Sequence, residues 1–357
     1  MLVFSMLGTL DRILGNRFGL GKEFEKGFML FGNMALSMIG MLVLSPLLAQ
    51  WCQPLFDFAA ATLHIDPSIV PASLFANDMG GAPLANAVAL DESIGMFNAL
   101  VVSSMLGCTV SFTIPYTLGV VQPDKHRELL LGLLCGIVTV PLGCLLAGLS
   151  IALPLGALMR NLLPLLLFSA VIAAALLVSP GKCVKVFSVM GFLMKALITV
   201  GLALAIFRFL TGKEILKGMD TLENGAAVCL NASAVMSGAF PLMYVVSRLL
   251  AKPMQQLGRK MNINETSVLG LVSSIATCVT TFGMARDMDR KGLLLNAAFA
   301  VSGAFTFAGH LAFTMAFDAA YITPMIIGKL SAGIAAVALA CLLSGRLLSN
   351  DVSKERK

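Results

Sequence analysis

The sequence contains few charged residues. Asp, Glu, Lys and Arg make up only 12% of its 357 residues, whereas 58% are hydrophobic and the mean hydropathy is +0.90. This composition excludes a soluble globular chain. We therefore expect a multi-spanning membrane protein whose main partner is the lipid bilayer.

Patterns that bind metals or support catalysis are also lacking. The eight cysteines are scattered without a Cys-x-x-Cys pair, and the three histidines do not cluster. No Ser/His/Asp arrangement, phosphate loop or dinucleotide fingerprint occurs in a suitable context. Asp287 and Asp289 alternate with Arg and Lys, which is typical of a solvated turn. The sequence predicts no metal, no cofactor and no enzymatic activity.

Instead, the chain has apolar stretches that are long enough to cross a bilayer, which takes about 20 residues each. Two further apolar segments, 67–90 and 266–285, are interrupted by small and polar residues, and each is interpreted as a re-entrant helical hairpin. The predicted fold is an all-α polytopic membrane protein with eight transmembrane helices and two hairpins. The eight predicted crossings are residues 28–50, 95–119, 128–152, 161–179, 186–210, 226–250, 292–317 and 322–345.

Basic residues indicate the orientation of the chain, because Lys and Arg in short loops collect on the cytoplasmic side. Few of the 25 basic residues lie in the connections assigned to the outer side, namely Arg160, Arg208, Lys213 and Lys217. Both termini are therefore expected in the cytoplasm. Residues 1–26 are predicted to form an interfacial amphipathic helix and a basic connection, and 346–357 a basic cytoplasmic tail. The net charge of +6 reflects this orientation rather than nucleic-acid binding.

The chain repeats its own organisation. A span, a hairpin and two further spans occur in residues 27–152 and again in 226–345, with two linking transmembrane helices in 153–225. An odd number of crossings separates the two copies, so they must have opposite orientations. Inverted repeats whose broken helices meet near the midplane recur in secondary transporters. We expect the two hairpin tips to approach a shared site.

One carboxylate, Asp78, lies at the centre of the first hairpin, next to Asn77 and close to Gly80 and Gly81. An ionisable side chain at membrane depth is costly and normally faces a protein interior or a wet cavity. Glycine allows backbone to approach a ligand closely. We therefore predict that these four residues bind substrate, with a structural ion pair of Asp78 as the alternative.

Two lysines inside predicted spans, Lys195 and Lys329, need a partner in the membrane. Each is interpreted either as a member of a buried ion pair or as a gating element, and one of them is expected to neutralise Asp78 in the empty state. At the second tip, Thr277 and Thr280 are predicted to bind substrate, with helix packing as the alternative.

The spans that follow the two hairpins contain Asn98 and Asn296. Both amides are predicted substrate ligands, and hydrogen bonding to a neighbouring helix is an equal alternative. His310 is interpreted as a satisfied buried histidine.

Several short segments occur in a specific order and spacing: Phe24-Glu-Lys-Gly-Phe-Met, Asp78-Met-Gly-Gly, Arg248-Leu-Leu-Ala-Lys-Pro, Phe282-Gly-Met, Met288-Asp-Arg-Lys-Gly, Ala298-Phe-Ala-Val-Ser and Ile327-Gly-Lys-Leu. Together they resemble the ethanolamine permease family of ethanolamine-utilisation operons (EutH), over about residues 24–344. The resemblance implies a bacterial inner-membrane transporter that admits ethanolamine, the substrate of a cobalamin-dependent lyase inside a microcompartment. The sequence does not determine whether the chain forms a homo-oligomer.

Ethanolamine is mostly a protonated amine at neutral pH. Asp78 is therefore expected to bind its ammonium group, while Asn77, Thr277 or Thr280 binds its hydroxyl. Phe75 or Phe282 would add a cation–π face.

The chain departs from better-known members of the family at two places. It has Thr277-Cys-Val-Thr280 where they carry an asparagine-rich tip with proline, and Ala308-Gly309 where they carry an aspartate before the histidine equivalent to His310. The alternative function is an ion-coupled transporter of another small polar solute, such as a nucleoside or another amine. A membrane ligand sensor without transport is a more distant alternative.

Overall fold

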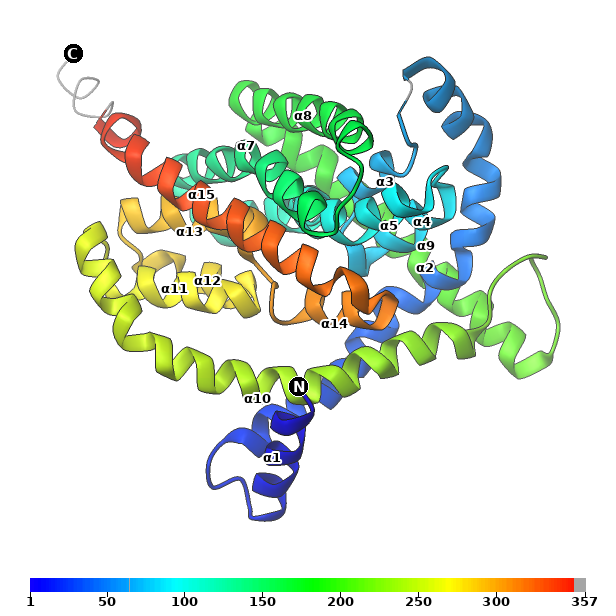
Figure 1. The fold of residues 1–357 in the computed structure, drawn as a ribbon, viewed down its shortest axis with the longest axis horizontal. Coiled ribbons are helices and arrows are strands. Elements are labelled where there is room, and N and C mark those ends of the chain that lie inside the picture. The colour runs from blue at the N-terminus through cyan, green and yellow to red at the C-terminus, as the bar shows by residue number, and fades with distance from the viewer. Residues whose placement is uncertain (64, 350–357) are drawn as a thin grey trace.

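The computed structural model describes the backbone of residues 1–63 and 65–349 (Figure 1). This part of the chain is built from helices and turns and contains no strand, in agreement with the predicted all-α class. Nothing is described of the side chains at residues 33, 37, 55–63, 180, 183, 184, 247, 250–252, 254, 255, 257 and 349.

Long apolar helices make the chain a multi-pass membrane protein. Seven helical segments of the described residues are long and apolar enough to span a bilayer: Leu20–Pro54, Glu92–Val120, Pro123–Ser150, Leu155–Val178, Lys185–Thr211, Leu222–Val246 and Ala319–Leu348. The sequence predicted eight such crossings, so one of them differs in the structure.

The crossing predicted at residues 292–317 is not one helix. It divides into α13 (Arg290–Gly303) and α14 (Gly309–Phe317). Phe305, between them, has a φ of 61°, a left-handed backbone conformation that interrupts a helix. The N–H groups of Phe305 and Phe307 donate to the carbonyls of Ser274 and Ile275, at 3.0 and 3.1 Å. The broken segment is therefore bonded to a neighbouring element instead of continuing the helix.

The first half of the chain contains a long helix, a broken pair of short helices and two further long segments. The first of these two segments, residues 92–120, is continuous but has π-helical turns, a feature often found at functional sites. The elements are α1 (Leu2–Ile13), α2 (Leu20–Leu63), α3 (Ile69–Leu74), η1 (Asn77–Met79), α4 (Gly81–Val88), α5 (Glu92–Phe97), η2 (Asn98–Gly107), η3 (Thr109–Thr113), α6 (Ile114–Val120), η4 (Pro123–Lys125) and α7 (His126–Ser150).

The second half has the same order of elements after two linking helices. We call α3 and α4 the first broken pair, and α11 and α12 the second broken pair. The elements are α8 (Leu155–Val178), α9 (Pro180–Thr211), α10 (Leu222–Met261), α11 (Glu265–Ala276), α12 (Cys278–Gly283), η5 (Ala285–Asp287), α13, α14, η6 (Ala319–Tyr321) and α15 (Ile322–Ser349). The last residues of the predicted tail, 350–357, lie outside the described residues.

In each broken pair, the chain segment before the pair is hydrogen-bonded to the segment after it. Before the first pair, the Asp66 carboxylate accepts hydrogen bonds from the N–H groups of Leu90 and Asp91, which follow the pair, each at 3.0 Å. Before the second pair, the N–H of Asn264 donates to the carboxylate of Asp289, which follows that pair, at 2.9 Å. Each pair therefore has the shape of a hairpin.

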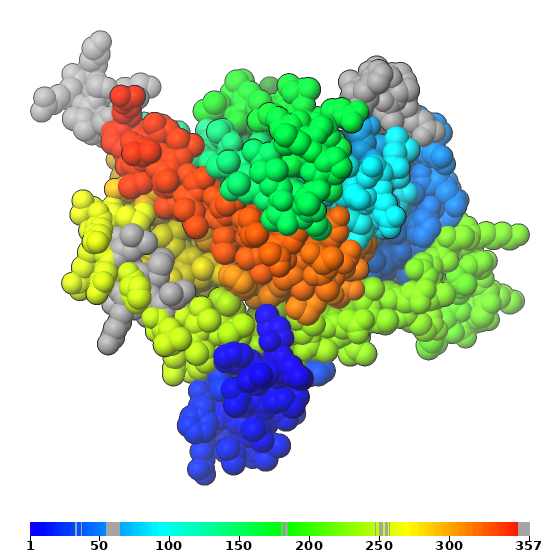
Figure 2. All heavy atoms as spheres, viewed as in Figure 1, coloured from blue at the N-terminus to red at the C-terminus, as the bar shows by residue number. Residues whose placement is uncertain are grey.

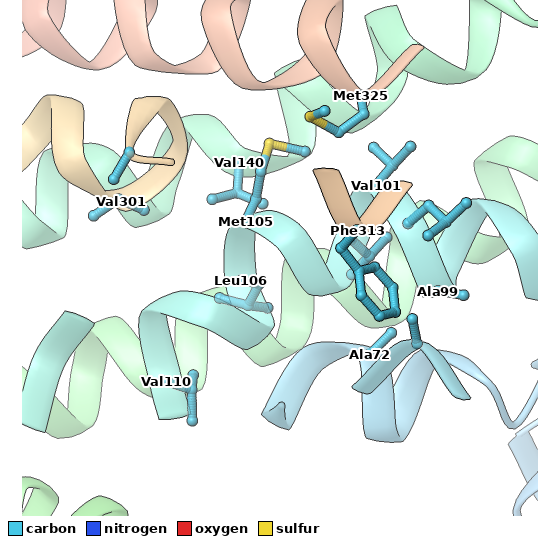
Figure 3. Close-up of a cluster of buried hydrophobic side chains, with 14 of the residues drawn as sticks. Ala72, Ala99, Val101, Met105, Leu106, Val110, Val140, Val301, Phe313 and Met325 are labelled. Atoms are coloured by element: carbon cyan, nitrogen blue, oxygen red, sulfur yellow. The ribbon is translucent and has the colours of Figure 1, made fainter. Parts of the chain in front are cut away.

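The core is formed around the π-helical segment η2, all of whose residues are buried. Figure 3 shows Met105 and Leu106 of this segment among side chains from α3, α7, α13, α14 and α15. Close helix packing surrounds it: a Cβ atom on Gly132 of α7 would lie 2.3 Å from the carbonyl oxygen of Leu294 in α13. Small residues at such positions let transmembrane helices approach closely.

The N-terminal helix α1 projects from this body (Figure 2) and exposes its apolar side chains, among them Leu2, Met6 and Ile13. Asp11 ends this helix in a fixed turn, because its carboxylate accepts hydrogen bonds from the N–H groups of Phe18 and Gly21, both at 2.8 Å. Burial raises the pKa of Asp11, but these backbone N–H groups outweigh burial and hold the pKa below its usual value. The interfacial position of α1 stays a prediction.

Candidate functional site

Asp78 lies in the break of the first broken pair. The turn that carries it is held by two contacts: the N–H of Ala76 donates to Ser111 Oγ at 3.0 Å, and the N–H of Gly81 donates to the Ala76 carbonyl at 2.8 Å. Gly80 has a φ of 93°, which favours glycine, and a Cβ there would lie 2.5 Å from Met41 Cγ. The two predicted glycines thus shape the turn that presents Asp78.

The Asp78 carboxylate faces the start of α14, on the other side of the break between α13 and α14. A Cβ atom on Gly309 would lie 3.5 Å from Asp78 Oδ2. The first N–H groups of a helix lack partners inside the helix, and this end of the helix carries partial positive charge. The Asp78 carboxylate therefore lies where the first broken pair contacts the break between α13 and α14.

Lys329 contributes a positive charge to the same region. It comes from α15, is only 1% exposed, and donates from Nζ to the carbonyl of Ser104 at 2.6 Å. Asp78 lies within electrostatic range of Lys329. The structure thus brings together the predicted pair Asp78 and Lys329.

Three further residues complete the cluster. Cys278 belongs to the second tip, which the sequence already indicated as part of the site, whereas Cys108 and His310 were not singled out as ligands. Cys108 lies near both Asp78 and Lys329. Cys278, the first residue of α12, lies in range of Cys108 and Lys329, and His310 of α14 lies in range of Lys329. We call Asp78, Cys108, Cys278, His310 and Lys329 the buried cluster, in which Asp78 is partly exposed and the other four are buried. The glycines on either side of residues 304–308 were the available signal for a break beside His310.

Several buried polar atoms next to these residues have no hydrogen-bond partner among the described residues. They are both amide atoms of Asn77, Nδ1 of His310 and Oγ1 of Thr314. The prediction that the ring nitrogens of His310 have hydrogen-bond partners is therefore wrong for Nδ1. Buried polar groups without a partner are rare and mark a place for water or a ligand.

A cavity of about 660 Å³ lies beside the first break and is lined by Met79, Ser111, Phe112, Tyr116 and Lys195, among others, but by no residue of the buried cluster. We call it the Met79 cavity. Phe112 stacks on Tyr116 at 5.3 Å between ring centroids and packs against Phe305 at 5.7 Å. Phe305 in turn lies 5.3 Å from the His310 ring. A row of aromatic rings thus extends from the cavity to the buried cluster.

The remaining predicted ligands lie elsewhere. The Asn98 and Asn161 amides bond to each other at 2.9 and 2.7 Å, and Asn98 also donates to Ser68 Oγ. Asn296 donates to the carbonyls of Ser267 and Gly292. Both predicted amides therefore hold neighbouring helices, as their alternative interpretation stated.

The other predicted site residues, Lys195, Thr277 and Thr280, line cavities and do not belong to the buried cluster. Lys195 was expected to be buried, but it is exposed on α9 and forms no ion pair with a described residue. Thr277 and Thr280 line another cavity, near Glu23. Among the residues that the structure describes, no group of three His, Cys, Asp or Glu side chains is placed to hold a metal ion.

Comparisons with known proteins identify the family. The family model described as "Ethanolamine utilisation protein, EutH" matches residues 1–343. A "Probable ethanolamine permease EutH" of Listeria monocytogenes is 36% identical over all of this chain and 95% of its own length. The protein of the same name in Salmonella typhimurium is 34% identical, over 96% of this chain and 93% of its own length. "Uncharacterized protein YxeR" of Bacillus subtilis is 36% identical, over 96% and 92%.

No solved structure matches the chain. The names of the Listeria and Salmonella relatives describe a permease and not an enzyme, in agreement with the lack of catalytic patterns in the sequence. Full-length coverage by the family model and the shared identity lead to one conclusion: the chain belongs to the EutH family of ethanolamine utilisation proteins.

Proposed function

We propose that this membrane transporter admits ethanolamine by binding its protonated amine at Asp78. The observation that carries the proposal is the position of the Asp78 carboxylate. It lies in the break of the first broken pair, close to the start of α14 and to polar atoms without a partner among the described residues. A small ammonium group requires such a counter-charge, and hydrogen bonds to a charged group are the stronger class. The names of the Listeria and Salmonella relatives support ethanolamine as the substrate.

The hydroxyl of ethanolamine is assigned to Asn77 and His310. Asn77 has both an unpaired acceptor and an unpaired donor, and His310 Nδ1 is unpaired as well. The aromatic row from Tyr116 to Phe305 offers ring faces along which a cation is attracted. These residues replace Thr277 and Thr280 as the proposed partners of the hydroxyl at the buried cluster.

We further propose that the two broken pairs are re-entrant hairpins of inverted repeats. Equivalent contacts support this: Asp66 accepts from the N–H and Oγ of Ser68, and Asn264 accepts from the N–H and Oγ of Ser267. Asp66 and Asn264 are 198 residues apart, as are Asp91 and Asp289, and Asn98 and Asn296. Movement of one repeat against the other would open the site alternately to the two sides of a bacterial inner membrane.

Uptake of labelled ethanolamine at acidic external pH tests the proposal, in cells that lack their own carrier. Acidic medium makes the freely permeant neutral amine scarce. Asp78→Asn should reduce uptake at least about tenfold, because a hydrogen bond to a charged partner contributes about 1.5–3 kcal/mol. Asp124→Asn, at an exposed carboxylate, is the matched control and should leave uptake unchanged.

Equal uptake by the Asp78→Asn and Asp124→Asn proteins, at matched membrane abundance, would remove Asp78 from the site. If the native chain moves no ethanolamine above background, the substrate is another small solute. Competition with other amines and with nucleosides would then identify its class.

A further inference from the structure

A second cavity lies where the start of α2, the middle of α10 and the second broken pair meet. Its volume is about 350 Å³, and it shares no lining residue with the Met79 cavity. Polar groups that line it include Glu23, Lys26, Tyr244, Thr277 and Thr280. We call it the Glu23 cavity.

The lining of this cavity suits a small amino alcohol. Glu23 supplies a carboxylate whose side chain is 18% exposed, and Thr277 and Thr280 supply hydroxyls. Phe240 and Tyr244 add aromatic rings. The Tyr244 ring already holds a cation, since the Arg248 guanidinium carbon lies 4.4 Å from its centroid. A carboxylate beside aromatic faces attracts an ammonium group.

The Glu23 cavity adjoins the buried cluster through the break of the second broken pair. Thr277 caps α12, where its side chain accepts from the N–H of Val279 at 3.2 Å. The next residue, Cys278, is fully buried and belongs to the buried cluster. Consecutive residues at this break therefore face the cavity and the cluster, and the break forms the wall between them.

We propose that the Glu23 cavity is a second amine site, where the Glu23 carboxylate binds the ammonium group of ethanolamine on its way between the buried cluster and water. This inference rests on the proposed function of Asp78. The distribution of basic residues assigns the cavity to the cytoplasmic side of the membrane.

Lys26 is the natural competitor for this carboxylate. Its ammonium pairs with Glu23 at 2.5 Å, but the Lys26 side chain is 63% exposed. Exposed ion pairs of this kind add little stability, so a substrate ammonium can replace Lys26 with small loss. Lys26 lines the cavity and Arg248 lies over the ring of Tyr244, so both positive charges lower the affinity of the cavity for a cation.

The opposite roles of Glu23 and Lys26 provide a sharp experiment. Ethanolamine transport is measured in right-side-out and inside-out membrane vesicles, so that substrate is supplied from each side in turn. Glu23→Gln should raise the half-saturating concentration about three- to tenfold when substrate is supplied from the cytoplasmic side, and change it less than about twofold from the other side. Lys26→Gln should lower the cytoplasmic value about two- to threefold.

Both variants break the same ion pair, so a purely structural role would shift transport and thermal stability in the same direction for both. That result would overturn the proposal. Glu25→Gln is the matched control, because Glu25 pairs with Arg12 and does not line the cavity. Identical values for the Glu23→Gln and Glu25→Gln proteins would overturn the proposal as well. Loss of transport by Asp78→Asn, measured in the same vesicles, tests the primary site independently.

Discussion

Asp78 and Lys329 have opposite charges in one buried cluster, yet within the described part of the chain they form no direct ion pair. The Lys329 ammonium donates to the Ser104 carbonyl instead. The carboxylate is therefore partly compensated by a nearby charge and by the start of α14. Under the proposed function, the ammonium group of the substrate supplies the ion pair that Asp78 lacks among the described residues. The substrate then does not have to displace Lys329 from an ion pair with Asp78.

Replacement of Lys329 by Met should make substrate bind more tightly and leave more slowly. The variant removes a positive charge near the site and preserves much of the apolar volume of the side chain. We expect the half-saturating concentration and the maximal rate of ethanolamine uptake each to fall at least about threefold, as close charge pairs are strongly coupled. Kinetics of uptake at matched membrane abundance measure both values. An unchanged half-saturating concentration would contradict this role, and Lys185→Met, at an exposed lysine near the start of α9, is the control.

Sequence reasoning located Asp78 because a lone carboxylate inside an apolar segment is costly wherever the chain folds. It did not select Cys108 or His310, since their neighbours in the cluster come from elements far apart in the chain. Asn98 and Asn296 donate hydrogen bonds to neighbouring helices, because an amide inside a span pairs with a helix as readily as with a ligand.

Among the elements, α7 supports the site from outside. It packs on α13 and α15, the helices that continue into α14 and carry Lys329. Gly132 permits this contact, because any Cβ there meets the Leu294 backbone. Thr139 of α7 also donates to the carbonyl of Ala332 in α15, at 3.1 Å. The position of the cluster therefore depends on close backbone packing between α7 and α13.

Gly132→Ala should separate these helices and destabilise the protein. The methyl group would lie 2.3 Å from the Leu294 carbonyl oxygen, and overpacking of this kind costs about 1–3 kcal/mol. Thermal unfolding of the detergent-purified variant, monitored by size-exclusion chromatography after heating, should show a lower transition temperature than that of the native chain. Gly156→Ala is the control, since a Cβ at Gly156 in α8 meets nothing within 4 Å. Equal stability of the two variants would show that α7 does not require this contact.

The break between α13 and α14 was not predicted from the sequence. Residues 292–317 are apolar enough to span a membrane, so their hydropathy favoured one helix. The actual break depends on carbonyls of α11 that accept the N–H groups of Phe305 and Phe307, and such tertiary contacts leave no periodic signal. The two hairpin-shaped pairs were easier to predict, because Gly80, Gly81 and the small residues around them interrupt apolar runs visibly.

For the whole molecule, the order of elements was predictable, whereas the meeting of distant elements was not. The positions of the two broken pairs follow from hydropathy and glycine, and both pairs occur in the structure within a few residues of the predicted bounds. The count of long helices and the separation of Lys195 from Asp78 required three-dimensional contacts. Orientation in the membrane is a further property of the whole chain, and it rests on the distribution of basic residues alone.

Single cysteines on opposite sides of the molecule test that orientation. Asp124 and Lys213 are both exposed in connections between long helices, and the positive-inside rule assigns residue 124 to the cytoplasm and residue 213 to the outer side. A membrane-impermeant maleimide should label Lys213→Cys in intact cells and Asp124→Cys only after the membrane is permeabilised. The parent chain measures labelling of native cysteines. The reverse pattern would place Glu23 and the Glu23 cavity on the outer side, so the stronger effect of Glu23→Gln would then be expected with substrate supplied from outside.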